Sequence, residues 1–381
     1  MAEYVFTPEQ TQLRDAVRKF STEHFGEAQA RVQMESEPRF DRAVWQRLGS
    51  ELGVLGLSVP EADGGVGGTL VDQAIAVEEL GAALATGPLF GTVYLAIPAL
   101  VAASAGAVRD ELLAALVEGT RTAAFLVPDR AGAFDPAAVT VTGTDKLTGT
   151  VARVVDADAA DELLVAATGP DGVALYAVDA AAEGVQRTGL VTLDLTRPQA
   201  TVELTDAPAR LIAGPDEAER VISHALQVGS ALLAAEQVGA ATHLLNLSVE
   251  YAKSRLQFGR LIGSFQAVKH RLAEGMVDLE HARSATYHAV WALTDASDDP
   301  ALAASIAQAL ASSAFSRIAA DTIQVHGGIG FTWEHQAHLY FKRASTDAAL
   351  LGGAEAHRDR VAALVLDTAS AERAPRVATG V

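Results

Sequence analysis

Residues 251–266 decide the fold of this chain, and they read Tyr-Ala-Lys-Ser-Arg-Leu-Gln-Phe-Gly-Arg-Leu-Ile-Gly-Ser-Phe-Gln. The stretch separates two long segments, 216–254 and 265–293, in which apolar residues recur at helical spacing. Phe258 and Gly259 interrupt that spacing. Two long helices joined by a short turn are typical of an antiparallel helical hairpin. We therefore expect the C-terminal part of the chain to be built on such a hairpin.

The turn inside this stretch carries three basic residues, Lys253, Arg255 and Arg260, in a chain that is otherwise acidic. Basic groups beside a glycine turn suit a ligand that bears phosphate, because a guanidinium can donate two parallel hydrogen bonds to its oxygens. Cations at the C-terminal end of a helix also cap its free carbonyl groups. Spacing alone favours capping, so a phosphate ligand needs further support.

The composition is that of a large globular protein with an excess of acidic groups. The chain has 381 residues, 49% of them hydrophobic, which is enough for two or three domains and a large core. Its net charge of −19 argues against nucleic acid as a partner over a broad surface. The absence of cysteine excludes disulfides, a thiolate nucleophile and a cysteine-ligated zinc site, and we expect no metal.

Targeting and membrane signals are weak throughout the sequence. The first residues, Met-Ala-Glu-Tyr-Val-Phe, do not resemble a signal peptide. No run of 18 or more apolar residues without a charge occurs, so we expect no membrane span. The expected protein is therefore soluble and cytoplasmic, with no membrane partner.

Three regions differ in their pattern. Residues 1–120 predict an N-terminal helical domain that starts with the capping sequence Thr-Pro-Glu-Gln at 7–10. Residues 121–214 hold short β-branched runs separated by turns, which predicts a small antiparallel β-barrel. Residues 215–381 predict a C-terminal helical bundle, with a disordered tail from Thr368. The fold class is mainly α with a central β-barrel.

Four stretches resemble the acyl-CoA dehydrogenase family, and the likeness covers nearly the whole chain. Residues 52–68 are similar to its Gly-Leu-x-Val-Pro-Glu-x-x-Gly-Gly loop. Residues 255–266 are similar to its Arg-x-x-Phe-Gly turn and the Phe-Gln that follows. Residues 321–331 are similar to its Gln-x-x-Gly-Gly-x-Gly-Phe stretch, and residues 339–343 to the segment before its catalytic loop. One match would be weak, but four in order and at the right spacing are specific.

The resemblance implies a fold and a reaction. Members of this family fold as a helical domain, a β-barrel and a four-helix bundle. They bind FAD and oxidise acyl-CoA thioesters to 2,3-enoyl-CoA, with a glutamate that takes the α-proton and a flavin N5 that takes the β-hydrogen as hydride. Electron-transfer flavoprotein or a similar protein then accepts the electrons.

The resemblance also implies which residues bind FAD. In such proteins the arginine of the turn and the Gln-x-x-Gly-Gly stretch reach an FAD that is held mainly by a neighbouring subunit. The matching positions are Arg255, Gln257, Phe258, Phe265, Gln266, Gln324, Val325, Gly327 and Gly328. A planar guanidinium suits a pyrophosphate, and glycines let backbone N–H groups approach a ligand. Without the resemblance, the two glycines would be an ordinary turn and His326 a packed side chain.

The expected catalytic base is missing from both positions where the family places it. The commoner position holds Leu351, and the rarer one, 26 residues before the turn arginine, holds Gly229. A matching family glycine is present as Gly239, which supports that register. Three acids lie near these positions in the sequence, and we expect each to be a solvated helix charge: Asp347, Glu236 and Glu355. Asp347 is the best placed to substitute, because it could share a helix face with Leu351.

The flavin-contacting strand of the barrel also departs from the family. The usual Thr-Glu-Pro-x-Ala-Gly-Ser piece corresponds to residues 125–133, which lack the threonine and end in Ala133. The usual Asn-Gly-x-Lys is replaced by residues 148–151, Thr-Gly-Thr-Val. We therefore expect the flavin-facing half of the chain's own site to be degraded and the half that reaches a neighbour to be kept.

Together these features resemble the non-catalytic partner subunit of heteromeric acyl-CoA dehydrogenases from actinobacterial steroid side-chain degradation. This interpretation implies a heterotetramer in which a homologous sister subunit supplies the glutamate, with steroid side-chain CoA thioesters as the acyl-CoA substrate. Two alternatives stay open. One is a self-sufficient homotetrameric dehydrogenase with a displaced base, and the other is a flavin-free scaffold of the same fold.

Overall fold

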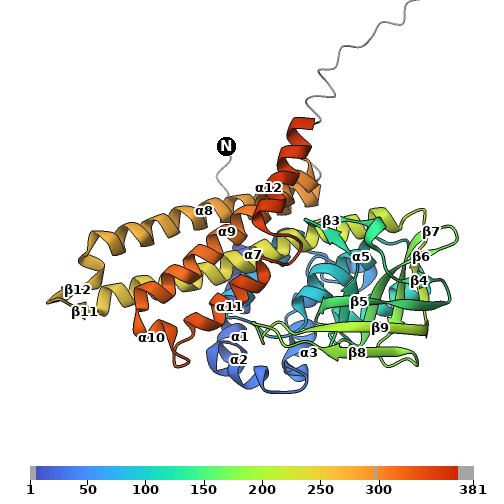
Figure 1. Cartoon of the computed structure of the whole chain (residues 1–381), viewed down its shortest axis with the longest axis horizontal. Helices are drawn as coiled ribbons and strands as arrows, with labels where there is room; N and C mark the ends of the chain where they lie inside the picture. The colour runs from blue at the N-terminus through green and yellow to red at the C-terminus, as the bar shows by residue number, and fades with distance from the viewer. Residues whose placement is uncertain (1–5, 296–297, 368–381) are drawn as a thin grey trace, which may run out of the picture.

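Helices form both ends of the chain and strands form its middle in the computed structural model, which describes residues 6–295 and 298–367 (Figure 1). The N-terminal helices are α1 (Pro8–His24), α2 (Glu27–Met34), α3 (Arg42–Ser50), η1 (Val54–Gly56), η2 (Glu61–Asp63), α4 (Leu70–Ala82), η3 (Leu89–Ala96), α5 (Ile97–Ala102) and α6 (Ala107–Val117). The predicted start of α1 is confirmed, because Thr7 and Gln10 exchange the two hydrogen bonds of a capping box. The tail that the sequence predicts to be disordered, 368–381, lies outside the described residues.

The strands follow between α6 and α7. They are β1 (Ala123–Leu126), β2 (Asp129–Arg130), β3 (Ala133–Phe134), β4 (Thr142–Gly143), β5 (Lys146–Val155), β6 (Glu162–Gly169), β7 (Gly172–Asp179), β8 (Val185–Gly189), β9 (Gln199–Pro208) and β10 (Arg210–Ala213), with the short helix η4 (Pro136–Ala138). Eight of them form one sheet in the order β10-β7-β6-β4-β5-β9-β8, and β1 pairs with β6.

The predicted antiparallel β-barrel is confirmed only as a central sheet, which is mixed and open in the described residues. Among the described residues, the sheet order ends at β8 and β10, which do not pair with each other, and both β1 and β4 run parallel to β6. Side chains alternate along β6 between two hydrophobic cores. Leu164 and Ala166 face the main helical core, whereas Leu163 and Val165 face a second core formed with β5 and β9. Short alternating strands fit an open, folded sheet as well as a barrel, so the sequence could not separate the two.

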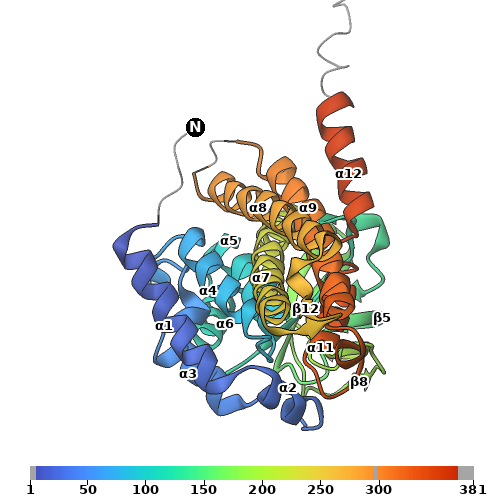
Figure 2. The same ribbon diagram turned by 90° about the vertical axis from the view of Figure 1, so that its left-hand side faces the viewer.

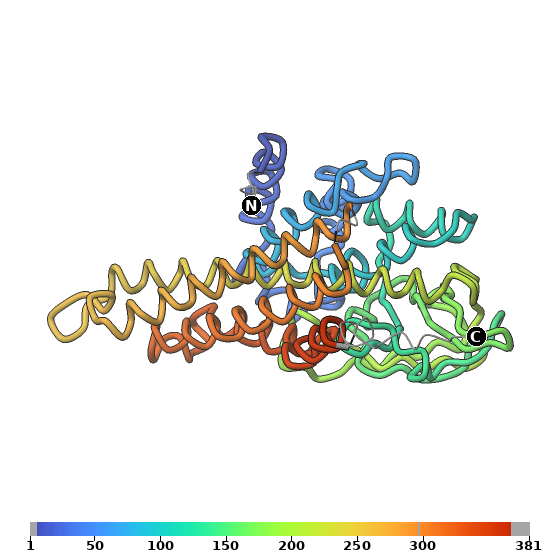
Figure 3. The backbone as a smooth tube through the Cα atoms, turned by 90° about the horizontal axis from the view of Figure 1, so that it is seen from above, coloured from blue at the N-terminus to red at the C-terminus, as the bar shows by residue number. Residues whose placement is uncertain are grey.

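The C-terminal elements form the predicted helical hairpin and its extensions. They are α7 (Ala218–Ser254), β11 (Leu256–Gln257), β12 (Arg260–Leu261), η5 (Ile262–Ser264), α8 (Gln266–Asp295), α9 (Pro300–His326), α10 (Gly328–Phe331), α11 (Ala337–Asp347), α12 (Ala354–Ala362) and η6 (Ala363–Asp367). The expected hairpin is confirmed, because α7 and α8 run antiparallel on either side of the β11–β12 turn (Figure 3). No helix in the described part of the chain has the length and apolarity that crossing a membrane requires.

Helix α7 is the centre of the molecule. Figure 2 shows it between α4 on one side and α8 and α9 on the other, and it packs against all three. Two glycines let α4 and α7 approach closely. A Cβ on Gly239 would lie 1.8 Å from the carbonyl oxygen of Glu78, and a Cβ on Gly81 would lie 2.3 Å from that of Glu236. This contact fixes the N-terminal helices against the bundle.

We predict that Gly239→Ala destabilises the fold. The added methyl group meets backbone of α4 rather than a flexible side chain, so the helices must separate, and such overpacking costs about 1–3 kcal/mol. Gly106→Ala is the matched control, because a Cβ there meets nothing within 4 Å. The free energy of unfolding, measured in urea, should fall only for Gly239→Ala. Equal midpoints for both variants would show that the close approach of α4 and α7 is unimportant.

Candidate functional site

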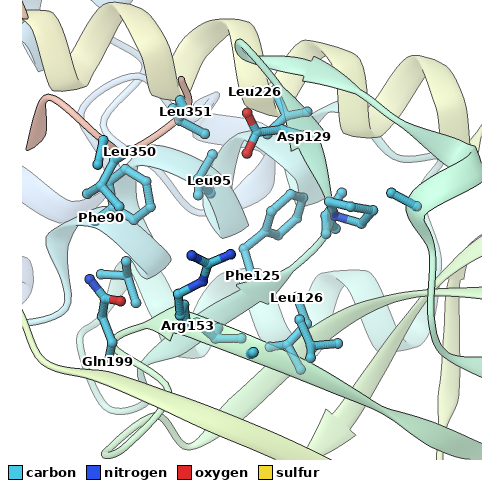
Figure 4. A pocket seen from close by; sticks show the side chains of 18 of the residues that line it. Phe90, Leu95, Phe125, Leu126, Asp129, Arg153, Gln199, Leu226, Leu350 and Leu351 are labelled. Atoms are coloured by element: carbon cyan, nitrogen blue, oxygen red, sulfur yellow. The ribbon is translucent and has the colours of Figure 1, made fainter. Parts of the chain in front are cut away.

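A cavity of about 770 Å³ lies where the sheet meets the helices (Figure 4). Its walls come from η3, β1, the β1–β2 turn, β5, α7 and the turn after α11. Most lining side chains are apolar: Phe90, Leu95, Phe125, Leu126, Val127, Val141, Val151, Val154, Val155, Leu193, Leu226, Leu350 and Leu351. A cavity of this size and character can hold a mainly apolar small molecule.

Leu351 lines this cavity at the position where the resemblance places the commoner glutamate. Its backbone has a φ of 53°, in the left-handed region, and its carbonyl oxygen accepts a hydrogen bond from His357 Nε2 at 2.8 Å. The next residue, Gly352, packs so closely that a Cβ there would lie 2.5 Å from Ala131 Cα. The turn is therefore held firmly, and it presents an apolar side chain to the cavity.

Gly229, the rarer glutamate position, lies beside the same cavity. A Cβ on Gly229 would be 2.5 Å from Leu95 Cδ2, and Leu95 lines the cavity. Helix η3 therefore occupies the space that a larger side chain on α7 would need. The structure thus brings both expected base positions to one cavity, and neither of them carries an acid.

The cavity contains a carboxylate that sequence reasoning missed. Asp129 lies in the wall near Leu226 and Leu351 (Figure 4). Its Oδ1 accepts a hydrogen bond from the Gly132 N–H at 3.0 Å, and burial raises the pKa of Asp129. Asp129 is distant in sequence from Leu351, so only the meeting of the β1–β2 turn with the turn after α11 could reveal it.

The expectation that Asp347 and Glu236 are solvated helix charges is wrong. Both side chains are fully buried in a cluster with two arginines. Arg343 Nη1 lies 2.5 Å from Glu236 Oε1 and its Nε lies 2.9 Å from Asp194 Oδ2. Arg197 Nη2 lies 2.5 Å from Glu236 Oε1, and its Nη1 lies 3.3 Å from Asp347 Oδ1. Glu355, in contrast, is exposed as expected.

The buried cluster shifts the pKa values of its two acids in opposite directions. Burial alone would raise the pKa of Glu236, but the charges of Arg197 and Arg343 hold it at about 2. For Asp347 burial outweighs the attraction of the same arginines and raises the pKa to about 8. Burial likewise raises the pKa of Asp156 to about 7. Asp347 therefore has a raised pKa although Arg197 lies 3.3 Å away, and it does not line the cavity.

The residues expected to bind FAD gather at the other end of the bundle. The ring of Tyr251, near the end of α7, stacks on the ring of His326, at the end of α9, with centroids 4.3 Å apart. This contact places the turn beside the Gln-x-x-Gly-Gly stretch. Seven of the nine residues are exposed and two are half-buried: Arg255, Gln257, Phe258, Gln266, Gln324, Gly327 and Gly328, then Phe265 and Val325.

The geometry of the turn does not support the capping alternative. The Ser254 hydroxyl, not an arginine, bonds the carbonyl oxygens of Glu250 and Tyr251 at the end of α7. Arg260 lies over the ring of Phe265, with its Cζ 3.9 Å from the ring centroid. Within residues 6–295 and 298–367, the Arg255 guanidinium makes no hydrogen bond or ion pair, so it is available to a ligand.

The turn and the cavity lie at opposite ends of the molecule. In Figures 1 and 3 the β11–β12 turn and α10 form one end of the bundle, and the sheet that walls the cavity lies at the other. One chain therefore does not unite the exposed arginine with its own cavity. A ligand that contacts both kinds of surface must therefore be bound by two chains.

Comparisons with known proteins agree with this architecture. The sequence profile "Acyl-CoA dehydrogenase, N-terminal domain" matches residues 7–120, and "Acyl-CoA dehydrogenase, C-terminal domain" matches residues 219–366. The chain is 38% identical to acyl-CoA dehydrogenase IpdE2 of Mycobacterium tuberculosis over 346 residues, which cover 90% of this chain and 93% of the relative.

Two solved structures of heteromeric proteins are also similar. One is a "Tcur3481-Tcur3483 steroid ACAD G363A variant", with a TM-score of 0.85 and 33% identity over 95% of this chain and 99% of that one. The other is the ChsE4-ChsE5 complex from Mycobacterium tuberculosis, with a TM-score of 0.84 and 30% identity over 98% of this chain and 100% of that one.

We predict that Asp347 makes the fold less stable as the pH rises. The folded state keeps the Asp347 proton up to about pH 8, whereas an unfolded aspartate loses it near pH 4. The unfolded state therefore binds fewer protons in this window, and the free energy of unfolding falls as pH increases. Asp347→Asn should reduce that slope by up to about 1.4 kcal/mol per pH unit.

The measurement is urea unfolding at several pH values between 4 and 8. Part of the slope should persist in the variant, since Asp156 is perturbed in the same direction. Glu355→Gln, at an exposed position, should leave the slope as in the wild type. A slope that Asp347→Asn leaves intact would mean that Asp347 is ionised in the folded state.

Proposed function

This chain belongs to the acyl-CoA dehydrogenase family, and on that basis we propose that it is the subunit of a heteromeric, FAD-dependent acyl-CoA dehydrogenase that lacks its own base. It completes the FAD site of a homologous, glutamate-bearing sister subunit. The separation of the exposed Arg255 end from a cavity lined by Leu351 carries this proposal. In this proposal each end of the chain forms half of a catalytic site. The cavity end would need an acid as the base, but the two family positions for that acid hold Leu351 and Gly229.

The bundle end has the chemistry that FAD would need from a neighbouring chain. Arg255 offers a planar pair of donors to a pyrophosphate. A Cβ at Gly259, Gly327 or Gly328 would meet nothing within 4 Å, so a ligand can approach the backbone there. Phe258 is 90% exposed, and such a ring can cover the flat face of a bound group. These residues fit an FAD that the sister subunit holds.

The proposed roles of the two subunits follow from the proton transfer that the reaction requires. Oxidation to 2,3-enoyl-CoA removes an α-proton to a carboxylate and a β-hydrogen as hydride. FAD, when bound, supplies the hydride acceptor. Leu351 cannot accept a proton, so in this proposal the sister subunit's glutamate does so. Arg255 and the Gln324–Gly328 backbone bind and orient the phosphates, and Phe258 helps exclude water.

The proposed substrate and partners are inferred from the similar proteins. One similar structure is a steroid ACAD of two components, and another is a complex of two chains. By analogy, we propose that this chain is part of a cytoplasmic heterotetramer. Its substrates would be steroid side-chain CoA thioesters, and electron-transfer flavoprotein or a similar protein would accept the electrons.

One observation favours a second candidate. Asp129 lies in the cavity with a raised pKa, near Leu226 and Leu351 (Figure 4). A carboxylate of raised pKa in a cavity can act as a general base. The alternative is therefore a self-sufficient homotetrameric dehydrogenase whose displaced base is Asp129.

We predict that Arg255→Ala lowers FAD occupancy of the heteromer. Loss of a charge-assisted hydrogen bond to phosphate costs roughly 1.5–3 kcal/mol, which weakens binding about 10- to 150-fold. Arg255→Lys should restore part of the affinity, because it keeps the charge and loses the planar fork. Retention of FAD is measured by absorbance after dialysis. Arg220→Ala, at the opposite end of α7, is the control and should retain FAD like the wild type; equal retention by Arg255→Ala refutes the role.

We predict that the chain purified alone does not oxidise acyl-CoA, and that activity appears with the sister subunit at about one FAD per heterodimer. Asp129→Asn should then change turnover by no more than a few-fold. A general base contributes roughly 10²–10⁴-fold, so its loss would be evident in a steady-state assay with a dye acceptor. If Asp129→Asn abolishes turnover while FAD stays bound, this chain is catalytic and the homotetramer is the correct interpretation.

A further inference from the structure

The strand β5 contains an irregularity that opens onto the cavity. Val151 pairs with Val202 and Val154 pairs with Ala200, so β5 has one residue more than β9 between these pairs. Arg153 lies in this bulge with a φ of 59°, in the left-handed region that a side-chain-bearing residue rarely adopts. Such strain is common where a fold must aim a particular side chain.

The bulge aims Arg153 into the cavity. Figure 4 shows its guanidinium rising from β5 into the space between Phe90, Gln199 and Phe125. In the part of the chain that the structure describes, the Arg153 side chain forms no hydrogen bond or ion pair. Arg153 is exposed at a mainly apolar cavity, and its guanidinium is open to an anion from outside.

The other charge in the cavity does not neutralise Arg153. Asp129 lies in the wall beside Leu226 and Leu351, and no ion pair joins the two described side chains. Asp129 already accepts a hydrogen bond from the Gly132 N–H, and burial raises its pKa. The space between Arg153 and that wall is bounded by apolar side chains such as Leu95.

We infer that this cavity binds an amphipathic carboxylate, an unesterified acid with one carboxylate and a bulky apolar body. Arg153 holds the carboxylate through its paired donors, with Gln199 beside it, and the apolar body lies against Phe90, Leu95 and Phe125. A single cation suits one carboxylate better than a phosphate group, which several donors usually bind. This cavity is also one half of the proposed catalytic site, but the residues that hold the carboxylate belong to one chain, so this binding goes beyond the proposed function and does not require a sister subunit.

The test is isothermal titration of the full-length chain with dodecanoate and with dodecanol, which differ in the charged head alone. Dodecanoate should bind more tightly than dodecanol. Arg153→Leu should weaken dodecanoate binding roughly 10- to 150-fold and leave dodecanol unchanged. Arg153→Lys should retain an intermediate affinity. Arg130→Leu, an exposed arginine on β2 that does not line the cavity, is the matched control and should bind dodecanoate normally.

A second variant keeps the test valid if Arg153→Leu unfolds. Arg153→Gly removes the charge and relieves the left-handed backbone, so it should fold and should lose dodecanoate affinity to the same extent. Three results would overturn the inference: no dodecanoate binding, equal binding of dodecanoate and dodecanol, or unchanged affinity in folded Arg153 variants. Because the readout is binding by one chain, these results are distinct from a failure of FAD retention or turnover in the heteromer.

Discussion

The structure depends on one buried ionic contact, in which Arg197 and Arg343 both hold Glu236. Glu236 is on α7, Arg343 is on α11 and Arg197 lies in the segment between β8 and β9, so three distant parts of the chain meet at one carboxylate. Tyr94 of η3 donates a further hydrogen bond to Glu236 at 2.8 Å. Removal of one partner would leave a buried charge uncompensated, which is far more costly than loss of an exposed pair. This contact therefore fixes the sheet and the bundle against each other.

The same contact sets the pKa values of the acids near the expected base positions. Two guanidinium groups lower the pKa of Glu236, and burial raises the pKa of Asp347. Neither acid lines the cavity, although Thr346 and Ala349, close to Asp347 in sequence, do. Glu236 and Asp347 are thus close in sequence to residues at the cavity, but their side chains belong to the buried cluster with Arg197 and Arg343.

The molecule has two separate surfaces with different chemistry. One is a mainly apolar cavity at the sheet, with Arg153 and Asp129 in its walls, and the other is an exposed arginine and glycine surface at the far end of the bundle. A long α7 keeps them apart, because a helix of 37 residues spans about 55 Å. In the proposed heteromer, this geometry would let the chain contact a neighbour's FAD at one end and a ligand in its own cavity at the other.

The sequence by itself determined the helical hairpin, the change from helix to strand and back, and the absence of an acid at Leu351 and Gly229. Helical spacing and turn residues are local signals, so α7 and α8 could be predicted to within a few residues. Tertiary structure alone decided three other features: the open sheet, the burial of Asp347 and Glu236, and the entry of Arg153 and Asp129 into the cavity. Each depends on which segments meet after folding, and alternation along a strand gives no information about its partner. The pKa of a carboxylate, likewise, is set by burial and by charges from other elements, which no local pattern records.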